Sequence, residues 1–134
     1  SEEKSVVIKH FQVVRLAIEP QACYLAALNA TEEQKQSLQL LSNEMVTLEK
    51  EFDRPHWIKV DFRFHLTIYR ACCNPFLISF ANLFRSVYQL YFDAITENDA
   101  IEVELHQQLA DAIINGNSRE AYDLCYTLLT TMNK

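Results

Sequence analysis

Asp61 and His65 are the two residues of this sequence best placed to do chemistry together. They lie four positions apart in residues 56–73, where apolar residues repeat with the period of an α-helix. At about 100° per residue, both fall on the apolar face beside Trp57 and Phe64. An acid and an imidazole are costly to bury unless they pair, form hydrogen bonds or bind a metal. Their spacing therefore indicates a polar or metal-binding site inside a helical bundle.

Two further polar residues fall on the apolar faces of other predicted helices. His106 lies on the apolar side of its helix, and Arg15 lies one turn from Phe11 in the first helix. Together with Asp61 and His65, they bring polar groups from three helices towards one core. We predict that these groups form a shared polar or metal site.

Purely structural roles are the alternatives for the same residues. A single inward-facing histidine is more often a hydrogen-bonded core residue than a ligand. Arg15 has an ion-pair partner in Glu19, one turn further along the helix. Asp61 and His65 can likewise bond to each other. His10 and His56 lie near predicted helix ends, and we assign them no role.

The composition restricts the class of protein. The chain has 134 residues, 49% of them apolar, with a net charge of −6, which suits one globular domain with a core. This charge argues against nucleic-acid binding by the chain alone, because such binding needs a basic face. No apolar run approaches the roughly 20 residues of a membrane span, and no signal peptide is recognisable. The four cysteines do not form a disulfide pattern, so we expect a cytoplasmic protein without membrane contact.

The pattern predicts an all-α fold of about six helices. Pro20 either starts a new helix or kinks the first, and Thr31 begins a capping box. Asn74 and Pro75 are typical of a helix start, and Gly116, the single glycine, is typical of a helix end. We expect helices over about 5–29, 31–52, 56–73, 75–96, 100–115 and 118–132.

Two of these helices carry long apolar stripes. We interpret the stripe of the helix over about 31–52 as core. The stripe of the helix over about 75–96 is aromatic, and we interpret it as core or a dimer face, with a pocket wall as the alternative. The opposite side of that helix, with Ser79, Asn82, Ser86 and Gln89, is expected to be solvated. The stripes consist of Leu38, Leu41, Met45, Leu48 and Phe52, and of Phe76, Phe80, Phe84, Tyr88 and Tyr91.

Three motifs in this order and spacing resemble the C-terminal effector-binding (FCD) domain of GntR-family transcription regulators of the FadR subfamily. The first is the segment Arg15–Ala22, followed by Leu-Ala-Ala. The second is Asp-x-x-Phe-His at 61–65, followed by Ala-x-x-Asn-Pro at 71–75. The third begins at His106 and runs through Gly-Asn at 116–117 to an alanine at 121. The resemblance covers nearly the whole chain.

The resemblance implies a single antiparallel helical bundle with a central ligand and metal cavity. Asp61, His65 and His106 match three of the family's four metal ligands, and the fourth falls on Leu128, which cannot bind metal. The site then has three protein ligands or has lost the metal. Cys125 lies one turn from Leu128 and could replace the missing ligand as a thiolate. A buried cysteine more commonly acts as a small hydrophobic residue. Two imidazoles and a carboxylate suit Zn, Ni, Mn or Fe.

The resemblance also implies a function. We expect residues 1–134 to sense a small organic acid, with Arg15 holding one end of that carboxylate-bearing effector. We assign no catalytic residues. The domain is expected to form a homodimer and to reach DNA only through the family's N-terminal winged-helix domain, which this sequence lacks. The alternatives are a small metal-dependent enzyme using the Asp/His/His site, and a plain helical interaction domain whose inward charges pair internally.

Overall fold

The computed structural model describes the backbone of residues 2–95 and 101–132 and the side chains of residues 3–90 and 101–131. Within these residues the chain forms six helices and no strand, which confirms the predicted all-α class. The helices are α1 (Glu2–Asn29), α2 (Glu32–Lys50), α3 (Arg54–Ala71), α4 (Pro75–Ile95), α5 (Val103–Ile114) and α6 (Ser118–Met132).

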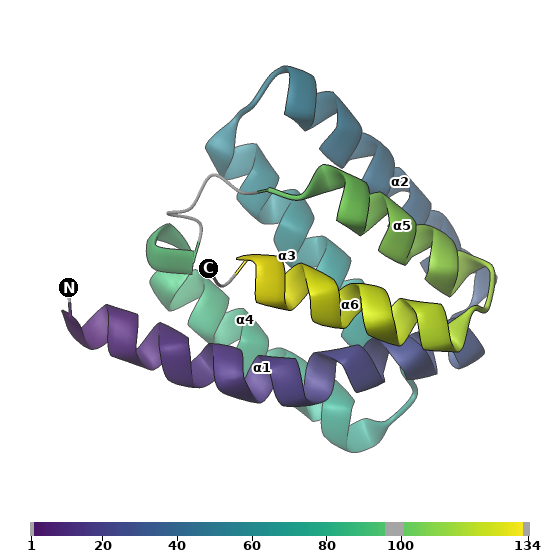
Figure 1. The fold of residues 1–134 in the computed structure, drawn as a ribbon, viewed down its shortest axis with the longest axis horizontal. Helices are drawn as coiled ribbons and strands as arrows, with labels where there is room; N and C mark the ends of the chain where they lie inside the picture. The colour runs from purple at the N-terminus through teal and green to yellow at the C-terminus, as the bar shows by residue number, and fades with distance from the viewer. Residues whose placement is uncertain (1, 96–100, 133–134) are drawn as a thin grey trace.

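The helices pack around one aromatic-rich core. In Figure 1, α1 runs along one side of the bundle and α2 lies on the opposite side. α3, α4, α5 and α6 all contact α1, whereas α2 packs against α3 and α5. The rings of Phe11, Phe62, Tyr69 and Tyr88 surround Phe84, at centroid distances of 5.4 to 6.1 Å. This packing brings the inner faces of α1, α3, α4 and α5 towards one region.

Local sequence signals fix most of the helix ends. Thr31 and Gln34 form the predicted capping box, with hydrogen bonds of 3.1 and 2.9 Å. The Asn74 side chain accepts from two backbone N–H groups at the start of α4, as predicted. Gly116 has φ 74°, the left-handed conformation that ends α5. These caps fix the starts of α2 and α4 and the end of α5.

Two details differ from the prediction, and a third settles an alternative. α1 is one helix with Pro20 inside it, so Pro20 does not start a new helix. α2 ends at Lys50, so Phe52 lies beyond the apolar stripe and is 49% exposed. α5 begins at Val103 rather than at Ala100, which lies outside the described residues.

The aromatic stripe of α4 does not lie on one face. Phe84 and Tyr88 are buried and Phe80 is partly buried, as predicted for core residues. Phe76 is 86% exposed, because steps of four residues turn the stripe gradually around the helix. The side chain of Tyr91 lies outside the described residues. The outer surface of α4 is therefore partly apolar.

Candidate metal-binding site

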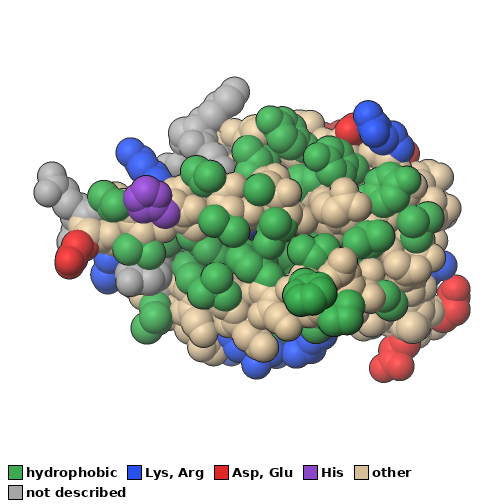
Figure 2. Space-filling view, turned by 90° about the horizontal axis from the view of Figure 1, so that it is seen from below, with side chains coloured by type: hydrophobic (Ala, Val, Ile, Leu, Met, Phe, Trp, Pro, Cys, Tyr) green, Lys and Arg blue, Asp and Glu red, His purple; other side chains and the backbone are tan. Residues whose placement is uncertain are grey.

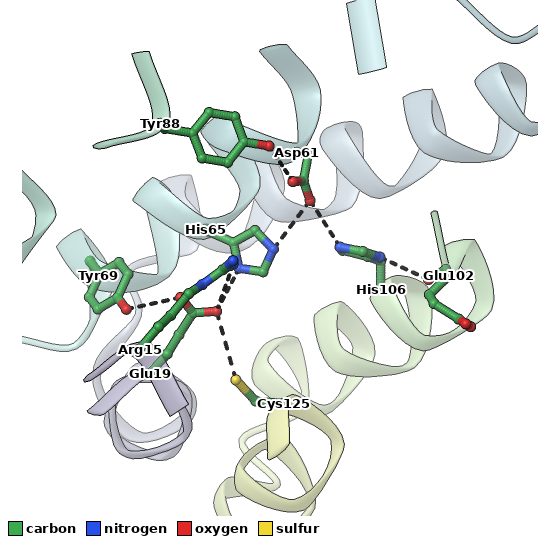
Figure 3. Close-up of polar contacts among 9 residues, drawn as sticks. All are labelled: Arg15, Glu19, Asp61, His65, Tyr69, Tyr88, Glu102, His106 and Cys125. Atoms are coloured by element: carbon green, nitrogen blue, oxygen red, sulfur yellow. Dashed lines mark hydrogen bonds and ion pairs between the residues drawn. The ribbon is translucent and has the colours of Figure 1, made fainter. Parts of the chain in front are cut away.

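Asp61 and His65 from α3 and His106 from α5 meet in the core, as predicted. Asp61 Oδ1 lies 3.2 Å from His65 Nε2 and 3.1 Å from His106 Nε2. One ligand atom from each of the three residues lies within 4.8 Å of the other two. All three side chains are buried. Figure 3 shows both imidazoles directed at the same carboxylate oxygen.

The orientation of His106 is set by the first turn of its helix. Its Nδ1 lies 2.8 Å from the backbone carbonyl oxygen of Glu102, which can only accept a hydrogen bond. Nδ1 therefore carries a proton, and Nε2 on the other side of the ring faces Asp61 Oδ1 at 3.1 Å. Trp57 and Phe64 contact the ring edge-on at centroid distances of 5.7 and 5.2 Å. A backbone acceptor and two aromatic rings thus hold the imidazole in place.

Tyr88 of α4 holds the other oxygen of Asp61. Its hydroxyl donates a hydrogen bond to Asp61 Oδ2, and its ring is 2% exposed. Asp61 consequently presents only Oδ1 to the two imidazoles. Sequence reasoning did not identify this role for Tyr88, because nothing in the aromatic stripe indicates which hydroxyl meets a carboxylate across the core.

Glu19 of α1 is the residue of this site whose importance was missed. It is fully buried, and Glu19 Oε2 lies 2.8 Å from His65 Nδ1. Its carboxylate also accepts a 2.9 Å hydrogen bond from the Tyr69 hydroxyl. His65 therefore lies between two carboxylates, Glu19 at Nδ1 and Asp61 at Nε2, although neither nitrogen is aligned for a hydrogen bond. The signal in the sequence was an acid on the same buried stripe as Arg15.

Arg15 pairs with Glu19, which is the ion-pair alternative considered for it. Its Nε and Nη2 lie 2.8 and 3.3 Å from the two carboxylate oxygens of Glu19. The guanidinium also lies over the ring of Phe84, 5.1 Å from its centroid. Arg15 is only 5% exposed, so it reaches the core as predicted. Its contact with an effector stays a prediction.

The buried charges stabilise one another. Burial acts to raise the pKa of Asp61, but attraction to His65 and the hydrogen bond with His106 outweigh it and hold that pKa well below its usual range. Burial acts to lower the pKa of His65, but the Glu19 and Asp61 carboxylates raise it to about 9. Burial also opposes ionisation of Glu19, yet Arg15 and His65 lower its pKa. The metal-free cluster is thus an array of paired ions.

The donor set fits a divalent metal. Two imidazole nitrogens and one carboxylate oxygen converge, as in sites for Zn, Ni, Mn or Fe. The far nitrogen of each imidazole faces a carbonyl or carboxylate oxygen, the outer support that metal-binding histidines usually have. His65 Nε2 lacks an aligned hydrogen bond, which is consistent with a lone pair available for a metal.

The fourth position of the predicted ligand set remains apolar. Leu128 is fully buried on α6. Cys125, the substitute considered for it, points towards Glu19 Oε2 at 3.9 Å, as Figure 3 shows. Burial raises the pKa of its thiol well above the usual range, which disfavours the thiolate that a metal needs. The cluster therefore offers three protein ligands.

Comparisons with known proteins place this geometry in context. A model of the FCD domain family matches residues 11–131. The HTH-type transcriptional regulator YieP of Escherichia coli (strain K12) is 48% identical over 128 residues, covering 96% of this chain and 56% of that protein. A GntR protein of Streptococcus agalactiae has the same fold, with a TM-score of 0.81 at 20% identity, covering 100% of this chain and 62% of that one. The chain thus spans little more than half of the length of these relatives.

Proposed function

The chain belongs to the FCD domain family, the effector-binding domain of GntR-type transcription regulators, and we propose that it senses a small organic acid through a divalent metal held by Asp61, His65 and His106. The family assignment confirms the resemblance predicted from the three motifs. The effector, the metal and the site residues are the proposal.

One observation carries the proposal: two buried imidazole nitrogens and a carboxylate oxygen converge in the core. An ion-paired core could be built with one histidine, or with none. In this cluster the Nδ1 atom of each imidazole also faces an oxygen atom, the Glu102 carbonyl for His106 and the Glu19 carboxylate for His65. Such outer contacts are typical of histidines that bind metal.

The charges of the site favour an anionic effector once a metal is present. As metal ligands the imidazoles are neutral, so Arg15, Glu19, Asp61 and a divalent ion would together carry one positive charge. When bound, the metal would act as a Lewis acid that fixes a carboxylate in an open coordination position. Glu19 takes one hydrogen each from Nε and Nη2 of Arg15, so contact between Arg15 and an effector would use Nη1 or the second hydrogen of Nη2.

The remaining parts of the proposal concern the longer protein. We propose that the domain pairs with a second copy of itself and reaches DNA through a separate N-terminal domain, as the helix-turn-helix name of its relative suggests. We propose binding rather than catalysis as its role, since its relatives are regulators. No helix of the described residues is long and apolar enough to cross a bilayer. The cytoplasmic location stays a prediction.

Metal analysis joined to mass spectrometry of co-purifying molecules tests the proposal. We expect the purified chain to hold about one divalent ion after loading with Zn or Ni, and to bind small carboxylates only in that state. Asp61→Ala should lose both. If the chain binds neither Zn, Ni, Mn nor Fe, the plain interaction domain with internally paired charges becomes the better interpretation.

A further inference from the structure

The two carboxylate oxygens of Asp61 have different partners. Asp61 Oδ1 lies 3.2 Å from His65 Nε2 and 3.1 Å from His106 Nε2, whereas Asp61 Oδ2 accepts a hydrogen bond from the Tyr88 hydroxyl. A carboxylate that binds a metal through both oxygens would have to give up such a hydrogen bond. Tyr88 therefore opposes two-oxygen coordination by Asp61 and leaves Oδ1 as its ligand atom.

The core holds the Tyr88 ring against this carboxylate. The ring is 2% exposed and packs on Phe62 and Phe84 at centroid distances of 5.3 and 5.4 Å. Phe62 follows Asp61 on α3 and also stacks on Phe84 at 5.8 Å. These contacts join Tyr88 of α4 to the helix that carries Asp61. Moving the hydroxyl away from Oδ2 would disturb close-packed rings.

The hydrogen bond lies in apolar surroundings. Asp61 and Tyr88 are both buried. Figure 2, seen from below Figure 1, shows hydrophobic side chains gathered on the side of the molecule where α1 lies, with most charged side chains around the margin. A hydrogen bond to an ionised carboxylate is strong, and a low local dielectric strengthens it further. The Tyr88 hydroxyl can therefore influence how Asp61 binds a metal.

The protein leaves a fourth coordination position open. In the part of the chain that the structure describes, Asp61, His65 and His106 are the one group of three or more His, Cys, Asp or Glu residues close enough to share a metal. Leu128 is apolar, and Cys125 points towards a Glu19 carboxylate oxygen. Three protein ligands with one open position is the arrangement of zinc sites that bind a ligand from outside the protein.

We propose that Tyr88 is a positioning residue that restricts Asp61 to coordination through Oδ1, and that it thereby favours four-coordinate Zn over Mn, which prefers six oxygen-rich ligands. The inference rests on the proposed metal site and deepens it, because it assigns a determinant of metal choice outside the three ligands. Without the Tyr88 hydroxyl, Asp61 Oδ2 is released and the carboxylate can bind through both oxygens. The site then suits metals of higher coordination number better than it does in the parent.

Tyr88→Phe tests the inference, and Tyr69→Phe is its matched control. Each change removes one buried hydroxyl and keeps the ring, but the hydroxyl bonds to Asp61 in the first case and to Glu19 in the second. Calorimetric titration gives the Zn and Mn affinities of each protein. Zn binds most sites more tightly than Mn in any case, so the informative quantity is the ratio of the two affinities. We expect this ratio to fall by at least about tenfold in Tyr88→Phe and to stay unchanged in Tyr69→Phe.

Visible absorption of bound Co(II) reports the coordination directly, and a loss of stability alone does not change it. Four-coordinate Co(II) absorbs visible light much more strongly than six-coordinate Co(II). The parent loaded with Co(II) should show the strong four-coordinate bands. The absorbance per bound Co(II) should fall in Tyr88→Phe and stay at the parent's value in Tyr69→Phe.

The outcomes separate this inference from the proposed function. A parent that binds none of Zn, Mn and Co(II) would overturn both. Weak six-coordinate bands in the Co(II)-loaded parent would overturn the inference alone, and this measurement needs no variant. An affinity ratio and a spectrum like the parent's in Tyr88→Phe, or equal changes in Tyr69→Phe, would show that the Tyr88 hydroxyl only supports the fold.

Discussion

The Glu19 carboxylate and the His65 imidazole lie 2.8 Å apart, Oε2 to Nδ1, with neither side chain exposed. The contact joins α1 to α3, and Arg15 and Tyr69 bond to the same carboxylate. Because Glu19 faces Nδ1, the Nε2 atom of His65 is directed to Asp61. One acid of the first helix therefore orients a ligand of the proposed metal site.

Glu19→Gln should separate this positioning role from a structural one. The change removes the charge that pairs with Arg15 and faces His65, so we expect a loss of about 3–5 kcal/mol in the free energy of unfolding. Metal affinity should also fall about 10–100-fold, the usual effect of losing an outer-shell partner. Urea denaturation and calorimetric titration with Zn measure the two effects.

Tyr69→Phe is the control for Glu19→Gln. It removes the 2.9 Å hydrogen bond to Glu19 without touching His65, so stability should fall by about 1 kcal/mol while metal affinity stays unchanged. Equal Zn affinity in Glu19→Gln and the parent would show that Glu19 only supports the fold.

Asp61→Ala should weaken metal or effector binding by at least about tenfold, about 1.4 kcal/mol, and leave the far-UV helix signal largely intact. Asp61 Oδ1 is the atom on which both imidazoles converge, so its loss removes a ligand and the acceptor they share. His106→Ala should act in the same direction. His56→Ala is the matched control, since that histidine is 51% exposed and pairs with Glu44 instead. Parent-like binding by Asp61→Ala would refute the site assignment.

Much of this arrangement followed from short-range patterns. The caps at Thr31, Asn74 and Gly116 act within one helical turn, so the sequence alone could locate those helix ends. Asp61, His65 and His106 were recognisable because each interrupts the apolar face of its own helix. A polar residue on such a face has to meet another polar group in the core.

The partners across the core could not be predicted in the same way. Glu19 and Tyr88 contact His65 and Asp61 from other helices, and helical periodicity gives no information on which helix faces meet. Glu19 was recognised only as a local partner of Arg15. Phe76 and Phe84 of the aromatic stripe face different surroundings, because a four-residue repeat drifts around the helix.

The chain by itself should not bind DNA specifically. Its net charge of −6 provides no basic face that could neutralise phosphates. Fluorescence anisotropy with duplexes at physiological salt should show no saturable, sequence-dependent complex, with or without added Zn. Selective retention of one duplex over a scrambled one by residues 1–134 would contradict the sensing-domain assignment.

Leu128→His should complete a four-ligand site. Leu128 is fully buried on α6, one turn from the buried Cys125, at the position where the resemblance places a fourth imidazole. Replacing an apolar side chain with a polar one should cost the metal-free protein about 1–3 kcal/mol in unfolding free energy. Excess Zn or Ni should recover this loss, because a metal that binds only the folded state stabilises it by mass action.

Thermal melting with EDTA and with excess metal measures the loss of stability of Leu128→His and its recovery by metal. Leu129→His is the control. Leu129 is 2% exposed on the same helix but points about 100° away from its neighbour, so a histidine there should cost similar stability without any recovery by metal. A larger metal-induced rise in melting temperature for Leu128→His than for the parent and Leu129→His would place position 128 at the cluster. Equal rises would mean that Leu128 faces another part of the core, and that the last helix is out of register with the family's ligand pattern.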